Sequence, residues 1–140
     1  MNKKDFVVVI PARLNSTRIK KKPLVNINGL PLVIKVCQRV AKFVDKDKIL
    51  VATEDLEVLD VCERFGFTAV ITKDTHEHPL ERVYEVASDI MPSKAYLVVN
   101  GDEPFFSDDT IPKLIQDYKL DPDFYVSNAA SQINNVADAL

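Results

Sequence analysis

The sequence FVVVIPARLNSTRIKKKP occupies residues 6–23 and changes abruptly in character at Pro11. Residues 6–10 are all apolar and mostly β-branched, and so short an apolar run is typical of a strand that is buried on both faces. Pro11 is expected to end that strand. The loop that follows is basic. Because open α/β sheets bind ligands at the carboxyl ends of their strands, a basic loop at this position indicates a site for an anion.

The rest of the chain alternates strand and helix patterns. Apolar runs at residues 48–52, 68–72 and 95–99 predict three further strands, and residues 124–127 predict a fifth. Four amphipathic helices are expected from buried residues at helical spacing: Val33, Val36, Cys37, Val40 and Val44; Val58, Leu59, Cys62 and Phe65; Val83, Val86, Ala87 and Ile90; Ile111, Leu114, Ile115 and Tyr118. This alternation predicts one α/β domain over residues 1–140, with a mostly parallel sheet and helices on both faces.

Several residues mark where these elements begin and end. Asn28-Gly29 predicts a tight turn, and Gly66 is expected to end the second helix. Thr53 is expected to cap the start of that helix, and Ser107 or Asp108 the start of the last one.

Composition excludes several classes of protein. The chain has 46% apolar and 28% charged residues, which is typical of a soluble globular protein, and its formal net charge of −3 argues against a general nucleic-acid binder. No apolar run approaches the roughly 20 residues of a membrane helix, and the N-terminus lacks the apolar region of a signal peptide. Cys37 and Cys62 are not in a CxxC spacing and are expected to be reduced core thiols. We therefore expect a cytoplasmic protein with neither a nucleic acid nor a membrane as its partner.

The basic loop has no glycine-rich phosphate-binding motif. GxxxxGK[ST] and GxGxxG are both absent, and the whole chain contains three glycines. Side chains and loop N–H groups would therefore hold a phosphate. Arg13 and Arg18 suit forked contacts with phosphate oxygens, and Lys22 suits a point charge. Lys20 and Lys21 are expected to be solvated.

An acidic pair follows the fourth predicted strand, in NGDEP at residues 100–104. A tight turn with Asp102 as an Asx-turn residue would explain this segment taken alone. The basic loop is expected at the same edge of the sheet, and Mg²⁺ is commonly bound by one or two carboxylates together with substrate phosphates. We therefore favour a metal ligand here, and Asp102 over Glu103.

Two histidines, His76 and His78, flank a glutamate between the third strand and the third helix. This pattern alone is a weak metal signal, and no third ligand stands at a suitable spacing. A loop facing a ligand crevice, or the charged start of a helix, is favoured over a zinc site.

Three segments resemble the sugar cytidylyltransferases in the same order and spacing. PARLNSTRIKKKPLVNINGLPLV at residues 11–33 is similar to the pattern PARxxSTRLPGKPLxxIxGxPM, and VNGDEPFF at 99–106 is similar to a QGDEP segment. THEHPLER at 75–82 stands in the place of HQSGTDR. Within the family the likeness is greatest to the 3-deoxy-manno-octulosonate (Kdo) cytidylyltransferases. Acylneuraminate cytidylyltransferases and spore-coat polysaccharide nucleotidyltransferases are relatives.

The resemblance implies a Rossmann-like nucleotidyltransferase fold, that of the nucleotide-diphospho-sugar transferases. It implies a CTP-dependent enzyme of lipopolysaccharide or other polysaccharide biosynthesis, which uses Mg²⁺ to transfer CMP from CTP to an acidic, Kdo-like sugar and releases pyrophosphate. The second half of the family pattern is absent, so this chain is expected to be the N-terminal part of a longer polypeptide. The full-length protein is expected to be a homodimer.

The resemblance also assigns roles by position. Arg13 and Lys22 would bind the triphosphate and stabilise the leaving pyrophosphate, and Asp102 would hold the metal. The other nucleotide-binding positions are Ala12, against the cytosine, Ser16 and Arg18, in the phosphate loop, and Asn100, where the family has a glutamine.

Three other functions remain open at this point. The chain could belong to a nucleotidyltransferase of another sugar or nucleotide, as in the spore-coat relatives. It could be a truncated, non-catalytic domain that binds nucleotide. A flavodoxin-like binding domain would share the topology but gives no reason for the basic loop.

Overall fold

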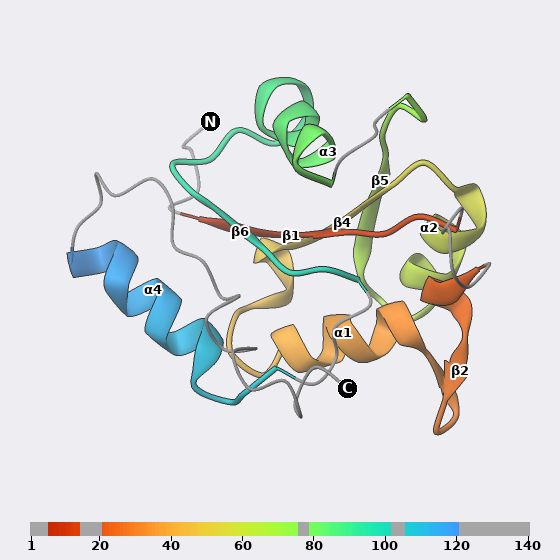
Figure 1. The fold of residues 1–140 in the computed structure, drawn as a ribbon, viewed down its shortest axis with the longest axis horizontal. Helices are drawn as coiled ribbons and strands as arrows, with labels where there is room; N and C mark the ends of the chain where they lie inside the picture. Colours follow the sequence, from red (N-terminus) through yellow and green to blue (C-terminus); the bar gives the residue numbers. More distant parts are fainter. Residues whose placement is uncertain (1–5, 15–20, 76–78, 102–105, 121–140) are drawn as a thin grey trace, which may run out of the picture. The chain divides into compact units, whose positions relative to one another are not determined.

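The computed structural model describes residues 6–14, 21–75, 79–101 and 106–120. The chain forms two compact units, Met1–Pro104 and Phe105–Leu140. The first unit holds the sheet (Figure 1), and the second contributes one described helix, α4 (Thr110–Leu120). The strand predicted at 124–127 lies outside the described residues.

The sheet of the first unit has four described strands in the order β5-β4-β1-β6, all parallel. Their bounds are Val7–Pro11 for β1, Ile49–Thr53 for β4, Thr68–Ile71 for β5 and Tyr96–Val98 for β6. Because every pairing is parallel, the carboxyl ends of all four strands lie at one edge. In Figure 1, β1 runs from left to right, so its carboxyl end lies at the right of the view.

Strand β1 is the buried centre of this sheet. Val7, Val8, Val9 and Ile10 have no exposed surface, and β1 is paired on one side with β4 and on the other with β6. Its β-branched residues favour the extended conformation and fill both faces. Pro11 is the last residue of the strand, so the predicted end of β1 is confirmed.

Helices cover both faces of the sheet, as predicted. Figure 1 shows α3 (Pro79–Glu85) on one side of the strands and α1 (Leu32–Val40) on the other. Helix α2 (Leu56–Arg64) connects β4 to β5, and α3 continues into a π-helical turn, Val86–Ile90. The predicted mostly parallel α/β architecture is therefore confirmed.

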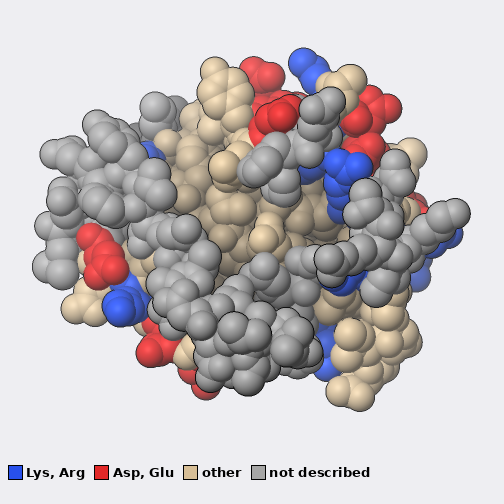
Figure 2. Space-filling view, in the orientation of Figure 1, with Lys and Arg blue, Asp and Glu red and all other residues tan. Residues whose placement is uncertain are grey.

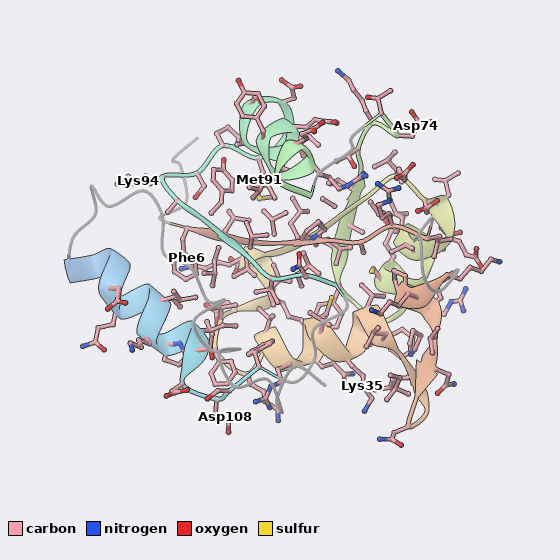
Figure 3. All side chains as sticks on the ribbon, in the orientation of Figure 1. Phe6, Lys35, Asp74, Met91, Lys94 and Asp108 are labelled. Atoms are coloured by element: carbon pink, nitrogen blue, oxygen red, sulfur yellow. The ribbon has the colours of Figure 1, made fainter. Side chains whose placement is uncertain are left out.

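The core under α3 contains alternate residues of β1 and β4, because successive strand residues point to opposite faces. This cluster consists of Val7, Val9, Leu50, Ala52, Val83 and Val86. The Met91 side chain packs against the cluster, whereas Asp74 lies at the outer end of the turn after β5 (Figure 3). The packing holds the first residues of the π turn against the sheet.

A small hairpin precedes α1. Strands β2 (Asn26–Ile27) and β3 (Leu30–Pro31) are antiparallel and are joined by the predicted Asn28-Gly29 turn. Both turn residues have positive φ, 52° and 91°, as a type I′ turn requires. Short 3₁₀ turns occupy Lys22–Leu24 and Lys46–Lys48.

Helix α1 is shorter than the periodicity predicts. It ends at Val40, and the chain continues in hydrogen-bonded turns in which the Val44 N–H reaches the Val40 carbonyl at 3.2 Å. Val44 is nevertheless buried. The pattern therefore predicted a core position correctly but the helical conformation wrongly, because a turn can return a side chain to the core as a further helical turn would.

Two predictions at α2 are wrong. Thr53 does not cap the helix; it is the buried last residue of β4, and Asp55 occupies the capping position. Phe65 is 37% exposed, because it follows the last helical residue. Gly66, at φ 83°, then reverses the chain and carries Phe67 into the core instead. Gly66 thus ends the helix as predicted.

Cys37 and Cys62 are buried free thiols, as predicted. In the described part of the chain, no helix combines the length and the apolar character that a membrane span needs.

Candidate functional site

The residues after β1 lie between the ends of two other strands. The Ala12 N–H donates to the Ala52 carbonyl of β4 at 2.9 Å, and the Gly101 N–H donates to the Pro11 carbonyl at 3.1 Å. The start of the basic loop therefore lies beside Gly101, at the edge of the sheet where the acidic pair was predicted; the pair itself lies outside the described residues.

Gly101 sits very close to the end of β1. A Cβ added at this position would lie 3.0 Å from the Pro11 carbonyl oxygen and 3.1 Å from the Ala12 Cβ. Those distances leave too little room for a side chain without a shift of the backbone. The segment that leads towards Asp102 is thus packed directly against Pro11 and Ala12.

Arg13 projects from this edge. Its side chain is 40% exposed, and its Nε lies 3.8 Å from Oε1 of Glu54, the residue that follows β4. This is an ion pair and not a hydrogen bond, since 3.8 Å is too long for an N–H···O bond. Arg13 is therefore both directed by a neighbouring carboxylate and accessible to solvent.

A second arginine reaches the same carboxylate from α3. Arg82 is 2% exposed, and its Nη2 lies 3.1 Å from Oε1 of Glu54. Its Nη1 donates to Oγ1 of Thr72 and, at 3.4 Å, to the Lys73 carbonyl. Figure 2 shows acidic and basic side chains side by side over α3 and the end of β5.

The two ends of the basic loop meet on α2. The Leu14 N–H donates to Oδ2 of Asp55 at 2.8 Å, and the Lys21 N–H donates to the Leu14 carbonyl at 3.0 Å. Nζ of Lys21 lies 3.5 Å from Oε2 of Glu57. The start of α2 therefore holds the loop at both ends, and Lys22, the first residue of the following 3₁₀ turn, is placed one residue beyond this anchor.

Of the predicted site residues, the structure brings together Ala12 and Arg13 beside Gly101, which follows Asn100, with Lys22 close to the loop anchor. The others, Ser16, Arg18 and Asp102, lie outside the described residues, as do His76, His78 and Glu103. Within the described ranges no three His, Cys, Asp or Glu side chains gather as a metal site.

Sequence reasoning missed the network around Glu54. It gave neither Glu54 nor Thr72 a role in the site. Glu54 directly follows β4 and Thr72 directly follows β5, at the edge of the sheet that carries Arg13. That shared position was the available signal.

The carboxyl ends of the strands are where open parallel α/β sheets bind their ligands. Residues 7–140 match the family model described as Cytidylyltransferase. The chain belongs to this cytidylyltransferase family.

Two curated relatives are 3-deoxy-manno-octulosonate cytidylyltransferases. That of Polynucleobacter asymbioticus is 36% identical over 136 residues, which are 96% of this chain and 53% of the relative. That of Verminephrobacter eiseniae is 34% identical over 135 residues, 95% of this chain and 49% of the relative. The chain thus spans about half the length of these relatives.

Solved structures agree with the fold. A structure of CMP:2-keto-3-deoxy-manno-octonic acid synthetase complexed with CTP matches 86% of this chain and 50% of its own, with a TM-score of 0.79 and 33% identity. A cytidylyltransferase from Leptospira borgpetersenii has a TM-score of 0.73 at 14% identity, again over 86% of this chain and 51% of its own. The latter likeness concerns the fold alone.

Proposed function

We propose that the protein containing this chain transfers CMP from CTP to an acidic, Kdo-like sugar and releases pyrophosphate, with residues 1–140 as its nucleotide-binding domain. The observation that carries the proposal is Arg13, held half-exposed at the carboxyl end of β1 beside the Asn100-Gly101 backbone. The CTP complex of a structural relative at 33% identity supports CTP as the nucleotide, and the names of the curated relatives support Kdo as the acceptor.

In this reaction a sugar hydroxyl attacks the α-phosphorus of CTP in line, and pyrophosphate leaves. Such chemistry depends mainly on positioning and on charge stabilisation. Arg13 and Lys22 would bind the triphosphate and stabilise the charge that develops on the leaving pyrophosphate, with Ser16 and Arg18 in the same loop. The Ala12 N–H is already bonded to the Ala52 carbonyl, so a contact of Ala12 with cytosine would use another of its groups.

Magnesium is part of the proposal, with Asp102 as its ligand in this chain. A carboxylate is a suitable donor for Mg²⁺, and Asp102 directly follows Gly101, which is packed on Pro11. When bound, Mg²⁺ would neutralise phosphate charge.

For the whole protein we further propose a homodimer, on the resemblance to its family. We propose a cytoplasmic setting, which two free cysteines fit.

The test is pyrophosphate release by the whole protein, measured with four NTPs and several acidic sugars. CTP with Kdo is expected to give the highest kcat/KM. Arg13→Ala is expected to lower it by about 100-fold, since removing one donor that stabilises transition-state charge has an effect of that size. The matched control is Lys42→Ala, which removes an exposed cation outside the site.

Asp102→Asn is expected to weaken the dependence of pyrophosphate release on Mg²⁺, and an unchanged dependence would show the metal assignment to be wrong.

If the protein binds CTP but releases pyrophosphate with no pair of nucleotide and sugar, the proposed transfer of CMP is contradicted. That outcome would favour the non-catalytic nucleotide-binding domain. Release with another nucleotide or sugar would instead place the protein with the nucleotidyltransferases of other substrates.

A further inference from the structure

Glu54 occupies an unusual position between two arginines. The same oxygen, Oε1, lies 3.1 Å from Nη2 of Arg82 and 3.8 Å from Nε of Arg13. The exposed fraction of the side chains rises in order, from 2% at Arg82 through 16% at Glu54 to 40% at Arg13. The three residues thus form a chain of charges from the protein interior to the proposed anion site.

The interior end of this chain is fixed. Arg82 donates to Thr72 and to the Lys73 carbonyl in addition to Glu54. The Thr72 N–H is itself bonded to the Thr53 carbonyl at 2.7 Å, which ties β5 to β4 beneath the arginine. A buried guanidinium with this set of partners has little freedom to move, and so it fixes the Glu54 carboxylate.

The two ends of this chain of charges differ in their exposure to solvent: 40% of the Arg13 side chain is exposed, and 2% of the Arg82 side chain. Arg82 is too buried to meet a substrate, so its charge acts within the protein. The contact of Arg13 with Glu54 is made by Nε, so the carboxylate directs the guanidinium from one edge.

The backbone at Leu14, directly after Arg13, is held by Asp55, the residue that follows Glu54. Oδ2 of Asp55 accepts the Leu14 N–H at 2.8 Å, and the Asp55 N–H donates to Oγ1 of Thr53 at 3.1 Å. The turn between β4 and α2 therefore fixes the main chain just after Arg13 while Glu54 directs its side chain.

We infer that Glu54 is a positioning residue, which acts through Arg13 to direct that guanidinium towards the triphosphate from a base fixed by Arg82. This inference rests on the proposed function, because it takes the triphosphate of a nucleotide as the ligand of Arg13. It makes a prediction opposite in sign to simple electrostatics. Removal of a negative charge beside a bound anion should strengthen binding, whereas loss of positioning weakens it.

The experiment measures CTP dissociation constants by calorimetry for wild type, Glu54→Gln, Arg13→Ala and the double variant. Glu54→Gln keeps an oxygen that can accept from Arg82 and is expected to bind CTP about tenfold more weakly than wild type. In the Arg13→Ala background the same change is expected to have no further effect, because the two residues act as a unit. Glu63→Gln, the same substitution at an exposed site on α2, is the control.

A second variant separates geometry from charge. Glu54→Asp keeps the charge but withdraws the carboxylate by one methylene, so this variant is also expected to bind CTP more weakly than wild type. In the Arg13→Ala background, Glu54→Asp is again expected to have no further effect. Thermal unfolding of each variant shows whether the fold is retained. CTP binding by either folded variant that equals or exceeds wild type, or an equal loss in the Arg13→Ala background, would overturn the positioning role. Failure of wild type to bind CTP would instead overturn the proposed function.

Discussion

Arg82 is the one charged residue among the buried side chains of the described part of the chain. Arginine is rarely buried unless it is paired. Its guanidinium has three protein partners, the Glu54 carboxylate, the Thr72 hydroxyl and the Lys73 carbonyl. The burial of this charge is therefore compensated locally, and the result is a rigid support beneath Arg13.

The thiols of Cys37 and Cys62 provide a second residue-scale property, which depends on pH. The pKa of the Cys37 thiol is raised well above its usual value, first by its hydrogen bond with the Cys62 thiol and then by burial. The folded state therefore keeps this proton at a pH where the unfolded chain has lost it. The contribution of Cys37 to the free energy of unfolding is fully present below the pKa of a cysteine in the unfolded chain, about 8.5. It is lost as the pH rises through the higher pKa that Cys37 has in the folded protein.

Urea unfolding between about pH 7 and pH 10 under reducing conditions measures this effect. The same hydrogen bond lowers the pKa of the Cys62 thiol, which opposes the effect, but the rise at Cys37 is the larger of the two shifts. The difference in unfolding free energy between wild type and Cys37→Ala is therefore expected to shrink as pH rises. The same comparison removes the contributions of lysine and tyrosine titration that both proteins share. A difference that stays constant over this range would contradict the assignment.

The sequence indicates candidate site residues but not the contacts that they make. Arg13 and Lys22 stand out because they belong to a basic loop that follows a buried strand. The role of Glu54 could not be predicted, since its partner Arg82 is 28 residues away and meets it only after β4, β5 and α3 have packed. Likewise, Asp55 resembles an ordinary helix-capping residue, and nothing local indicates that its carboxylate binds the Leu14 N–H.

At the scale of elements, the parallel sheet could be predicted because each strand is a short apolar run separated by an amphipathic helix. Errors fell at element ends, where α1 stops at Val40 and Phe65 leaves the core. Hydrophobic periodicity identifies which residues are buried, but a turn or a left-handed glycine decides which conformation buries them.

The contact between the ends of β1 and β6 leads to a prediction for Gly101. Gly101→Ala is expected to destabilise the fold by roughly 1–2 kcal/mol, because a Cβ 3.0 Å from the Pro11 carbonyl oxygen forces the two segments apart. The displaced backbone is expected to weaken CTP binding several-fold, measured by calorimetry beside chemical unfolding.

Gly29→Ala is the matched control. Its φ of 91° makes alanine strained, but an added Cβ would have no atom within 4 Å. This variant is expected to lose stability and keep its CTP affinity. If Gly101→Ala also keeps the affinity of wild type, the close packing at this edge has no part in nucleotide binding.

For the molecule as a whole, charge is distributed unevenly. The formal net charge is −3, yet one loop contains Arg13, Arg18 and three consecutive lysines. Acidic residues at the start of α2 hold that loop at both of its ends. A positive loop on an acidic body suits a small anionic ligand, and the proposed function takes that ligand to be a nucleoside triphosphate.

The central claim is a cytidine triphosphate site at the carboxyl edge of β1, and calorimetric titration of CTP, UTP, ATP and GTP with Mg²⁺ tests it most directly. Wild type is expected to bind CTP most tightly, and Arg13→Ala to bind CTP at least about tenfold more weakly, as expected when a charge-assisted contact to phosphate is lost. Lys42→Ala serves as the control and should match wild type. Equal affinity for all four nucleotides, or CTP binding that is unchanged in Arg13→Ala, would contradict the claim.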